Sequence, residues 1–380
     1  MFRIKNALIY DSLSESFREG QALIGDGKFG KVSFGADAGN CPVDGEIDCG
    51  GRAVIPGLVD IHTHGRGGYD FCGATAAQMR EMKALYAATG VTTVLPTLAS
   101  ATYDEWIDSI DAVKAAGYDG IHFEGIWLSP SKRGAHNEAL LRLPDPVMLR
   151  KLVGRCEGFK AIRATVAPEL EHGAEFIKEA VTLGVQISVG HSNATYEEAL
   201  AALDAGATSF THTYNAMSAM SHRNPGCVGA ALLSDAYAEC ICDGFHLHPA
   251  AVKLLAGSKG VGADGRTVLI TDSMMAAGMP DGDYSIGGLP VVVKDSKAWT
   301  VEGAIAGSTL DLWDGVKNFA AFSGVTLEEA IPCATAIPAK CAGLDGLCGS
   351  IAEGLRADFC VLSSDRKTIE KVYFAGEAVR

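Results

Sequence analysis

The sequence lacks both a long hydrophobic run and an apolar leader. No uninterrupted apolar stretch approaches the roughly 20 residues that cross a membrane. The opening segment, MFRIKN, has basic side chains at positions 3 and 5 and no apolar core of a signal peptide. These absences predict a cytoplasmic protein that has no membrane partner.

Positive charge is also scarce. The chain has 32 Lys and Arg against 46 Asp and Glu, which gives a formal net charge of -14. Nucleic acids and anionic membranes attract basic surfaces, so the balance excludes nucleic acid as the expected partner. An anionic substrate would have to be held by a local group of donors.

Paired cysteine motifs are missing. The eleven cysteines include no CxxC spacing. An odd number of scattered cysteines fits reduced, packed thiols better than a disulfide framework or a structural zinc site. Cys240 and Cys242 fall on one face of a predicted strand, where packing is the simplest role.

What remains is the composition of an ordinary globular enzyme. Of the 380 residues, 48% are hydrophobic and 21% are charged, which is enough for one large core and a smaller module. The 45 glycines cluster at the predicted ends of strands and helices, as expected of a fold with many tight turns.

The central part of the chain repeats one pattern, an apolar strand followed by an amphipathic helix. Strands are predicted at 54–62, 91–98, 120–128, 161–168, 185–191, 208–214, 238–243 and 268–272. Helices with the 3.6-residue period are predicted at 75–88, 103–116, 174–183, 196–205, 310–322, 326–334 and 338–342. Eight such strands predict an α/β fold of the (β/α)₈ TIM barrel type.

The two ends of the chain show a different pattern. Residues 1–52 alternate short β-type runs with Gly, Asp and Asn turns, and residues 346–380 return to strands. We predict that these segments form one discontinuous small β-sandwich domain beside a barrel at 53–345. A Gly-, Asp- and Val-rich stretch at about 278–303 breaks the barrel pattern and predicts a β-hairpin insertion.

The most informative motif is PGLVDIHTHG at 56–65. It reads as a buried strand that ends in His-x-His, and the two-residue repeat of a strand turns His62 and His64 to the same face. Imidazole is the commonest metal ligand, and a hydrolytic zinc or iron site needs further N or O donors. Capping or hydrogen bonding is the alternative role of such a pair.

Four other predicted strands end in a histidine or an acid. These side chains are Glu124, His191, His212 and Asp272. In a parallel barrel the carboxyl ends of the strands meet at one rim, where active sites lie. The pattern therefore predicts that residues far apart in the sequence converge on one site.

The predicted convergence suggests a metal-assisted hydrolase. Glu124, His191 and His212 suffice, with water, for one tetrahedral site. His62 and His64 would complete a second site that shares Glu124, or would serve as donors behind the first. Asp272 would act as general base, the alternative being a helix-capping aspartate.

Motifs along almost the whole chain resemble the amidohydrolase superfamily and, within it, the N-acetylglucosamine-6-phosphate deacetylases. Besides PGLVDIHTHG, the similar segments are HFEGIWLSPSKRGAHN at 122–137, VGHSNATYEEAL at 189–200, FTHTYNAMSAMSHRNPGCVGAAL at 210–232, CDGFHLHP at 242–249, LITDSMMAAGMPDGDY at 269–284, AGSTLDL at 306–312 and GSIAEGLRADFCVL at 349–362. The first motif is general to the superfamily, whereas those at 210–232 and 242–249 are more particular to the deacetylases.

The resemblance implies specific roles. Glu124, His191 and His212 would hold a divalent metal, zinc first with ferrous iron as the alternative, and Asp272 would be the acid/base. Because the chain keeps His62 and His64, which some family members lack, a second ion is expected to have ligands here. The implied substrate contacts are Ala135, His136, Asn215, Ala216, Arg223, Asp243, Gly244, Phe245, His246, Ile305, Ala306 and Gly307.

The resemblance also implies the reaction and the partners. The substrate would be a small phosphorylated N-acetyl amino sugar, and the products would be acetate and an amino sugar phosphate such as glucosamine 6-phosphate. Family members commonly pair, so a homodimer is expected. One departure from the family pattern is Ile126, which replaces the usual proline after Glu124-Gly125 and alters the backbone next to a predicted ligand.

Three alternatives stay open at this point. The galactosamine epimer of the substrate, or another N-acyl amine, would use the same site. A catalytically dead scaffold would be expected to have lost metal ligands or the terminal acid, and here all are present. A cyclic-amide hydrolase of the superfamily would carry a lysine at the end of the fourth strand, and residues 161–169 contain none.

Overall fold

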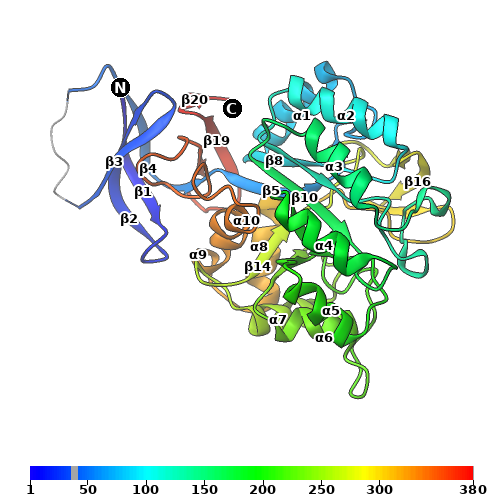
Figure 1. The fold of residues 1–380 in the computed structure, drawn as a ribbon. Helices are drawn as coiled ribbons and strands as arrows, with labels where there is room; N and C mark the ends of the chain where they lie inside the picture. The colour runs from blue at the N-terminus through cyan, green and yellow to red at the C-terminus, as the bar shows by residue number, and fades with distance from the viewer. Residues whose placement is uncertain (36–41, 380) are drawn as a thin grey trace.

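The centre of the molecule is a barrel of parallel strands surrounded by helices (Figure 1). A computed structural model describes residues 1–35 and 42–379. Eight strands form one sheet in the order β14-β13-β12-β11-β10-β9-β8-β5. They are β5 (Leu58–Thr63), β8 (Val91–Leu98), β9 (Gly120–Phe123), β10 (Ala161–Val166), β11 (Gln186–Val189), β12 (Ser209–Phe210), β13 (Tyr237–Ile241) and β14 (Thr267–Ile270). The predicted barrel fold is confirmed.

Hydrogen bonds from the residues just after β14 connect the two end strands of this sheet, β14 and β5. The Asp272 N–H donates to the His62 carbonyl over 2.9 Å, and the Thr271 hydroxyl donates to the Asp60 carboxylate over 2.5 Å. These bonds bring the last strand beside the first. They therefore put the residues that follow β14 next to the His-x-His pair.

Helices connect the strands and pack around them. They are α1 (Ala76–Ala88), α2 (Tyr103–Ala115), α3 (Pro146–Arg155), α4 (Gly173–Thr182), α5 (Tyr196–Asp204), α6 (Gly226–Leu233), α7 (Pro249–Lys259), α8 (Leu312–Ser323), α9 (Leu327–Ala330) and α10 (Ala336–Cys341), with short 3₁₀ turns η1 (Pro130–Lys132), η2 (Glu138–Leu140) and η3 (Ile331–Ala334). Four helices start with a threonine whose hydroxyl accepts the N3 backbone N–H, while the N3 Glu or Gln accepts the threonine N–H. This reciprocal capping explains why those helices begin where they do.

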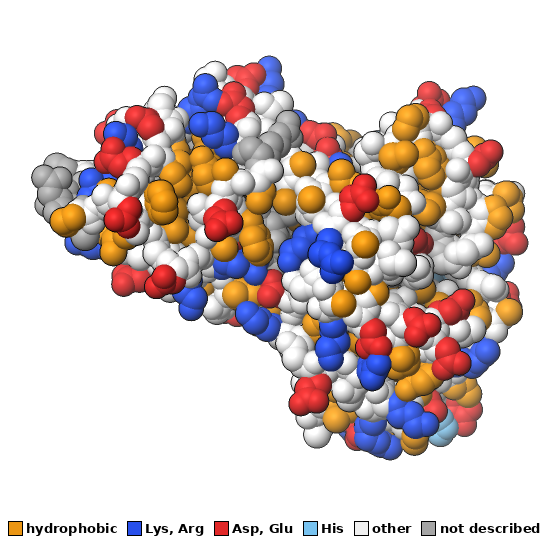
Figure 2. Space-filling model, turned by 90° about the horizontal axis from the view of Figure 1, so that it is seen from above, with side chains coloured by type: hydrophobic (Ala, Val, Ile, Leu, Met, Phe, Trp, Pro, Cys, Tyr) orange, Lys and Arg blue, Asp and Glu red, His pale blue; other side chains and the backbone are white. Residues whose placement is uncertain are grey.

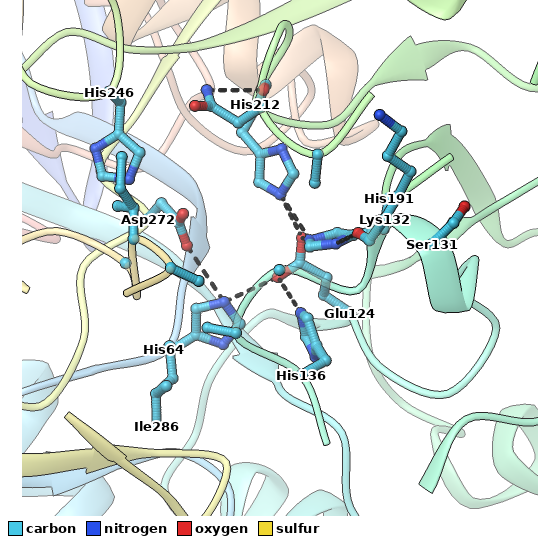
Figure 3. A pocket seen from close by; sticks show the side chains of 17 residues that line it. His64, Glu124, Ser131, Lys132, His136, His191, His212, His246, Asp272 and Ile286 are labelled. Carbon is cyan, nitrogen blue, oxygen red and sulfur yellow. Dashed lines mark hydrogen bonds and ion pairs between the residues drawn. The ribbon is translucent and has the colours of Figure 1, made fainter. Parts of the chain in front are cut away.

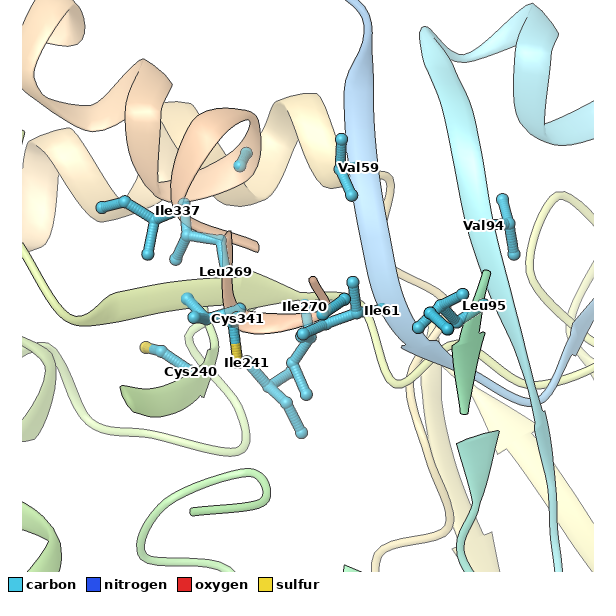
Figure 4. Close-up of a cluster of buried hydrophobic side chains, with 14 of the residues drawn as sticks. Val59, Ile61, Val94, Leu95, Cys240, Ile241, Leu269, Ile270, Ile337 and Cys341 are labelled. Carbon is cyan, nitrogen blue, oxygen red and sulfur yellow. The ribbon is translucent and has the colours of Figure 1, made fainter. Parts of the chain in front are cut away.

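The apolar core lies between the strands and the helices. Figure 4 shows Val59 and Ile61 of β5, Leu269 and Ile270 of β14, and Ile337 of α10 within it. All five side chains are fully or almost fully buried. Val59 and Ile61 lie two residues apart and share one face of β5, so the intervening Asp60 and the following His62 lie on its other face.

The barrel interior is unusually polar. Asp60, His122, Arg163 and Glu239 are all completely buried there. His122 lies between two hydroxyls, Thr97 at 3.2 Å and Thr165 at 2.8 Å. Buried polar groups of this kind are retained only where they are hydrogen-bonded, so this part of the barrel is built around specific contacts.

Both ends of the chain contribute to one seven-stranded sheet beside the barrel (Figure 1). Its strands are β1 (Phe2–Asp11), β2 (Ser16–Gly25), β3 (Lys28–Phe34), β4 (Gly45–Pro56), β18 (Phe359–Leu362), β19 (Ile369–Phe374) and β20 (Glu377–Ala378). Its core contains Ile4, Phe29 and Phe359. Because β4 continues almost directly into β5 at Leu58, this sheet is tied to the start of the barrel.

The predicted insertion forms a small antiparallel sheet. It contains β15 (Gly282–Ile286), β16 (Leu289–Lys294) and β17 (Lys297–Thr300), one strand more than the expected hairpin. Its inner face packs Ile286, Val291 and Val293 against Met274. A two-stranded sheet of β6 (Gly65–Arg66) and β7 (Tyr69–Asp70) lies directly after the His-x-His strand.

The surface matches the composition. Acidic and basic side chains are interspersed over the face in Figure 2, and hydrophobic ones gather over parts of it. Across residues 1–35 and 42–379, no helix has both the length and the apolar composition that a membrane span needs.

Candidate metal centre and substrate pocket

The ends of five barrel strands carry the candidate ligands. His62 lies within β5, and the other side chains follow their strands within a few residues. Three of them have left-handed backbones, with φ of 47° at His191, 27° at His212 and 49° at Asp272. Non-glycine residues pay of order 1–3 kcal/mol for such a conformation. The surrounding structure therefore holds these three side chains against a local cost, a pattern that clusters at functional sites.

Glu124 is the centre of the cluster (Figure 3). One carboxylate oxygen, Oε1, lies 2.9 Å from His212 Nε2 and 3.3 Å from His191 Nε2. The other, Oε2, lies 2.9 Å from His64 Nε2 and 3.0 Å from His62 Nε2. One carboxylate thus joins two pairs of imidazoles.

Asp272 completes the second of these pairs. Its Oδ1 lies 3.3 Å from His64 Nε2 and 3.5 Å from His62 Nε2. Two groups of buried side chains result, and the ligand atoms within each group lie within 4.8 Å of one another. The first group is His62, His64, Glu124 and Asp272, and the second is Glu124, His191 and His212. The structure therefore brings together all six residues that sequence reasoning placed at the site's centre.

Contacts behind two of the imidazoles fix which nitrogen faces Glu124. The Lys132 carbonyl lies 2.7 Å from His191 Nδ1, and a carbonyl can only accept, so Nδ1 carries the proton and Nε2 has a free lone pair. On the other side, Glu239 Oε2 lies 2.9 Å from His62 Nδ1. In both rings the nitrogen that points into the cluster is the one free to bind an ion.

The electrostatics of the cluster show strong mutual dependence. Burial opposes ionisation of Glu124, but the surrounding imidazoles outweigh it and hold the pKa of Glu124 well below its usual range. His62 makes the largest of these contributions. Burial likewise opposes protonation of His64, yet the carboxylates of Asp272 and Glu124 raise its pKa to about 9. For Asp272, burial is outweighed by His62 and His64, which lower its pKa to about 2.

The donor set fits a divalent metal. Glu124 Oε1 is buried without a hydrogen bond of proper geometry among the described residues, although two Nε2 atoms lie within 3.3 Å of it. The Nε2 atoms of His191 and His212 are only 3.0 Å apart, and His191 has no proton there to donate when its ring is neutral. Imidazole nitrogens and carboxylate oxygens that converge in this way are the ligands that zinc and iron take in proteins.

A cavity of about 340 Å³ opens over the cluster. Its walls combine the metal-centre residues with loops from around the rim. It is lined by His64, Glu124, Ser131, Lys132, Gly134, Ala135, His136, His191, His212, Asn215, Ala216, His246, Asp272, Ile286, Ala304, Ile305 and Gly307. His62 lies beneath this surface and is completely buried.

Seven of the twelve substrate contacts implied by the sequence line this cavity. They are Ala135, His136, Asn215, Ala216, His246, Ile305 and Gly307. His136 is held from behind by the Ser100 hydroxyl, which lies 2.9 Å from its Nδ1. Burial lowers the pKa of His136 well below its usual range, so the ring is neutral.

The other five residues lie outside the lining. Asp243 acts through a neighbour, because its Oδ2 lies 2.7 Å from His246 Nδ1 and its Oδ1 accepts the Phe245 and His246 N–H groups. Gly244 and Phe245 belong to the same turn, and Ala306 is completely buried. Arg223 is exposed on the loop before α6 and does not reach the cavity of its own chain.

Five lining residues were missed by sequence reasoning: Ser131, Lys132, Gly134, Ile286 and Ala304. Three of these lie in the segment SPSKRGAH at 129–136, of which only Ala135 and His136 were predicted to contact the substrate. Ile286 comes from the inserted sheet, and Ala304 follows β17. Their arrangement shows that the inserted sheet supplies one wall of the cavity.

Comparison with known proteins gives consistent matches. The amidohydrolase family matches residues 53–379. The chain is 34% identical to the N-acetylglucosamine-6-phosphate deacetylase of Vibrio furnissii, over 88% of this chain and 84% of that protein. It is also 34% identical to the N-acetylgalactosamine-6-phosphate deacetylase of Escherichia coli O157:H7, over 85% and 87%.

Among solved structures, the chain is similar to the N-acetyl-D-glucosamine-6-phosphate deacetylase of Mycobacterium smegmatis, a mutant of which was crystallised in complex with N-acetyl-D-glucosamine-6-phosphate. The TM-score is 0.91 at 34% identity, covering 100% of this chain and 99% of that one.

Proposed function

The chain belongs to the amidohydrolase family, and from that premise we propose that it hydrolyses N-acetylglucosamine 6-phosphate to acetate and glucosamine 6-phosphate. The observation that carries the proposal is the Glu124 carboxylate, shared by two pairs of imidazoles at the floor of the cavity. The chain's similarity to deacetylases of both hexosamine 6-phosphates supports this substrate class.

The metal ligands follow from the same contacts. Glu124, His191 and His212 would hold one divalent ion, and His62 and His64 would hold a second one with Glu124 as the shared carboxylate. Zinc is proposed for both, with ferrous iron as the alternative. Such an ion polarises an amide carbonyl and lowers the pKa of a water molecule.

Asp272 carries the proton in the proposed reaction. Its carboxylate lines the cavity beside His64 and is ionised, so it can take a proton from the attacking water as the oxygen bonds to the acetyl carbon. The same proton then goes to the amide nitrogen as the C–N bond breaks. Water is consumed, and the products are the free amine and acetic acid, which ionises to acetate by giving its proton to solvent.

His246 is proposed to orient the sugar. Asp243 accepts its Nδ1–H, which directs the ring and leaves Nε2 to face the cavity. Nε2 is proposed to accept a hydrogen bond from a sugar hydroxyl there. Asn215 and Ala216 supply further polar groups on the same wall.

Lys132 is proposed to bind the phosphate. Among the described residues that line the cavity, it is the one lysine or arginine, and a phosphate in a chain of net charge -14 needs such a cation. Lys132→Met is expected to raise KM for the phosphorylated sugar by about 10- to 100-fold, since a hydrogen bond to a charged group contributes about 1.5–3 kcal/mol. Turnover of unphosphorylated N-acetylglucosamine is expected to stay the same.

Two features make this prediction specific. The substitution keeps the main-chain carbonyl of residue 132, which holds His191, so the metal centre stays intact. Lys178→Met on the exposed side of α4 removes the same charge elsewhere and serves as the control. Steady-state kinetics of both variants decide the matter, and equal effects on the two substrates would contradict phosphate binding by Lys132.

The epimer specificity is tested by acetate release from both hexosamine 6-phosphates. The galactosamine epimer is the second candidate, because the relative from Escherichia coli O157:H7 is named for it. We expect kcat/KM to favour the gluco form by about 10-fold or more, the discrimination expected where a hydroxyl loses its hydrogen-bonding partner. A preference for the galacto form would reject the first choice, and no acetate from either would reject both.

We also propose a homodimer that works in the cytoplasm. Support for the dimer is the position of Arg223, which is exposed and lies outside the cavity of its own chain. In a dimer, a second copy would present its Arg223 to this cavity.

Support for the location in the cytoplasm is that the ten cysteines among the described residues are all free thiols. Cys41 lies outside the described residues.

A further inference from the structure

A buried carboxylate lies beneath the metal cluster, and of its contacts only the one with His62 has been described so far. Glu239 is on β13, points into the barrel interior and is completely buried. A carboxylate without access to water is costly unless its partners satisfy it. The partners of Glu239 therefore show what it is there to hold.

One oxygen of Glu239 contacts both halves of the cluster. Oε2 lies 2.9 Å from His62 Nδ1 and 3.1 Å from the main-chain N–H of His212. His62 belongs to the group that shares Glu124 Oε2, and His212 to the group that shares Glu124 Oε1. Glu239 thus joins from below the same two groups that Glu124 joins from above.

The other oxygen of Glu239 is held by a buried arginine. Arg163 on β10 donates from Nη2 to Glu239 Oε1 over 2.6 Å and is itself completely buried. Its remaining contacts are the Ser209 hydroxyl at 3.3 Å and the Cys341 sulfur at 3.1 Å; Figure 4 shows Cys341 beside β13 and β14. Because guanidinium is always charged, Glu239 stays an acceptor toward both of its other partners.

Stability alone is a poor reason for this arrangement. A buried ion pair is often no more stabilising than apolar residues of similar volume, and a barrel interior is commonly filled by branched apolar side chains. An acceptor at Glu239 Oε2 instead orients the two groups that donate to it. It requires a proton on His62 Nδ1, which leaves Nε2 as the lone pair that faces Glu124, and it satisfies the N–H of the strained His212.

We propose that Glu239, held by Arg163, is a positioning residue that sets the tautomer of His62 and the main-chain conformation of His212, and so keeps the two halves of the metal centre in register. The inference rests on the proposed metal site. Glu239 touches neither the cavity nor the substrate, so its effect passes entirely through the two histidines.

The isosteric substitution Glu239→Gln gives a specific expectation. If the amide oxygen faces Arg163, the NH₂ group faces His62 and the His212 N–H, and His62 is driven to the tautomer with a proton on Nε2. If the amide is turned the other way, its NH₂ group opposes the Arg163 guanidinium. Either orientation leaves donors facing donors, which costs about 1–3 kcal/mol per unsatisfied group.

Removing Arg163 resolves this conflict. In Arg163→Met/Glu239→Gln the amide oxygen is free to accept from His62 and from His212, as the carboxylate does. The double variant should therefore bind metal better than Glu239→Gln alone, although it carries one more change. Simple damage to packing predicts the opposite order.

The test is metal binding by equilibrium dialysis against zinc for the full chain and four variants. These are Glu239→Gln, Arg163→Met, the double variant and Asp358→Asn, the last being a matched control. Asp358 is also a buried carboxylate paired with an arginine, Arg356, at 2.8 Å, but it precedes β18 in the terminal sheet. Long-range ¹H–¹⁵N NMR of histidine-labelled, zinc-loaded protein reports the tautomers directly.

Glu239→Gln is expected to weaken zinc binding by about 10- to 100-fold, the usual effect of removing a partner behind a metal-bound histidine. The double variant should recover most of this loss, and Asp358→Asn should bind zinc like the unsubstituted chain. Unchanged zinc binding by Glu239→Gln would overturn the proposal, as would a double variant no better than the single one.

Should Glu239→Gln fail to fold, the remaining pair decides. Arg163→Met and the double variant both keep an oxygen that accepts from His62 and from the His212 N–H, so both are expected to bind zinc within about 10-fold of the unsubstituted chain. A larger loss of zinc binding in the double variant would contradict the inference. A chain that shows the expected zinc series but releases no acetate would reject the proposed function and leave the role of Glu239 standing.

Discussion

Asp272→Asn is expected to lower kcat by about 10²–10⁴-fold, the range that positioned general acid–base groups contribute. The amide has nearly the same shape and can occupy the same place at the end of β14, but it cannot take a proton from water or return one to the leaving amine. His64 and His62 keep the pKa of Asp272 at about 2 in the protein. The carboxylate is therefore ionised throughout the neutral range.

The metal content of this variant separates catalysis from assembly. Glu124, His191 and His212 form their group without Asp272, so the first ion should remain bound. Asp104→Asn, on the exposed first turn of α2, is the control for loss of a carboxylate. A variant with full activity would contradict the role of Asp272, and one that loses the first ion as well would make the residue structural.

Glu124→Gln is expected to abolish zinc binding at the cluster and, with it, turnover. Its two carboxylate oxygens each face a pair of imidazoles, and an amide can offer an oxygen to only one pair. The other pair would face an NH₂ group. Loss of an ion that contributes several kcal/mol to the transition state corresponds to a fall of about 10³-fold or more in kcat.

Thermal unfolding provides a readout for this variant that does not depend on activity. An ion that binds the folded state alone raises the unfolding temperature as its concentration rises. The unsubstituted chain should therefore gain stability when zinc is added after chelation, and Glu124→Gln should gain little. An equal zinc response in both proteins would show that zinc binds somewhere else.

The barrel could be predicted because its signal is local and repeated. All eight predicted strands are present, and β12 is shorter than expected, with only Ser209–Phe210 in regular pairing. Three helices, α3, α6 and α7, were not predicted, and of these α6 lacks the amphipathic period. The sequence of α6, GCVGAALL, is apolar throughout, and seven of its eight residues are buried, so no polar face marks it. The domain limits at 52 and 345 stay predictions.

The convergence of the candidate ligands was predictable, but their geometry was not. Residues at strand ends in a parallel barrel share one rim, which predicts that the candidate ligands lie together: His62, His64, Glu124, His191, His212 and Asp272. The left-handed backbones at His191, His212 and Asp272 have no local signature, because only tertiary contacts hold them there. The implied contact of Arg223 with the substrate stays a prediction, since it would need a second copy of the chain.

The contact between Arg163 and Glu239 and the position of Lys132 could not be predicted, for a different reason. Arg163 and Glu239 lie 76 residues apart within strands that otherwise read as ordinary apolar runs. Nothing near either residue in the sequence indicates the other. Lys132 was visible as part of a motif, but its place on the cavity wall depends on how the η1 turn packs against His191.

The central claim is that Glu124, His191 and His212 hold a divalent ion at the floor of the cavity. Anomalous diffraction from crystals grown with zinc, recorded on both sides of the zinc absorption edge, tests it most directly. We predict a strong anomalous peak about 2.0–2.2 Å from one Glu124 oxygen and from the Nε2 atoms of both histidines. An active enzyme whose crystals show no anomalous density among these three side chains would contradict the account.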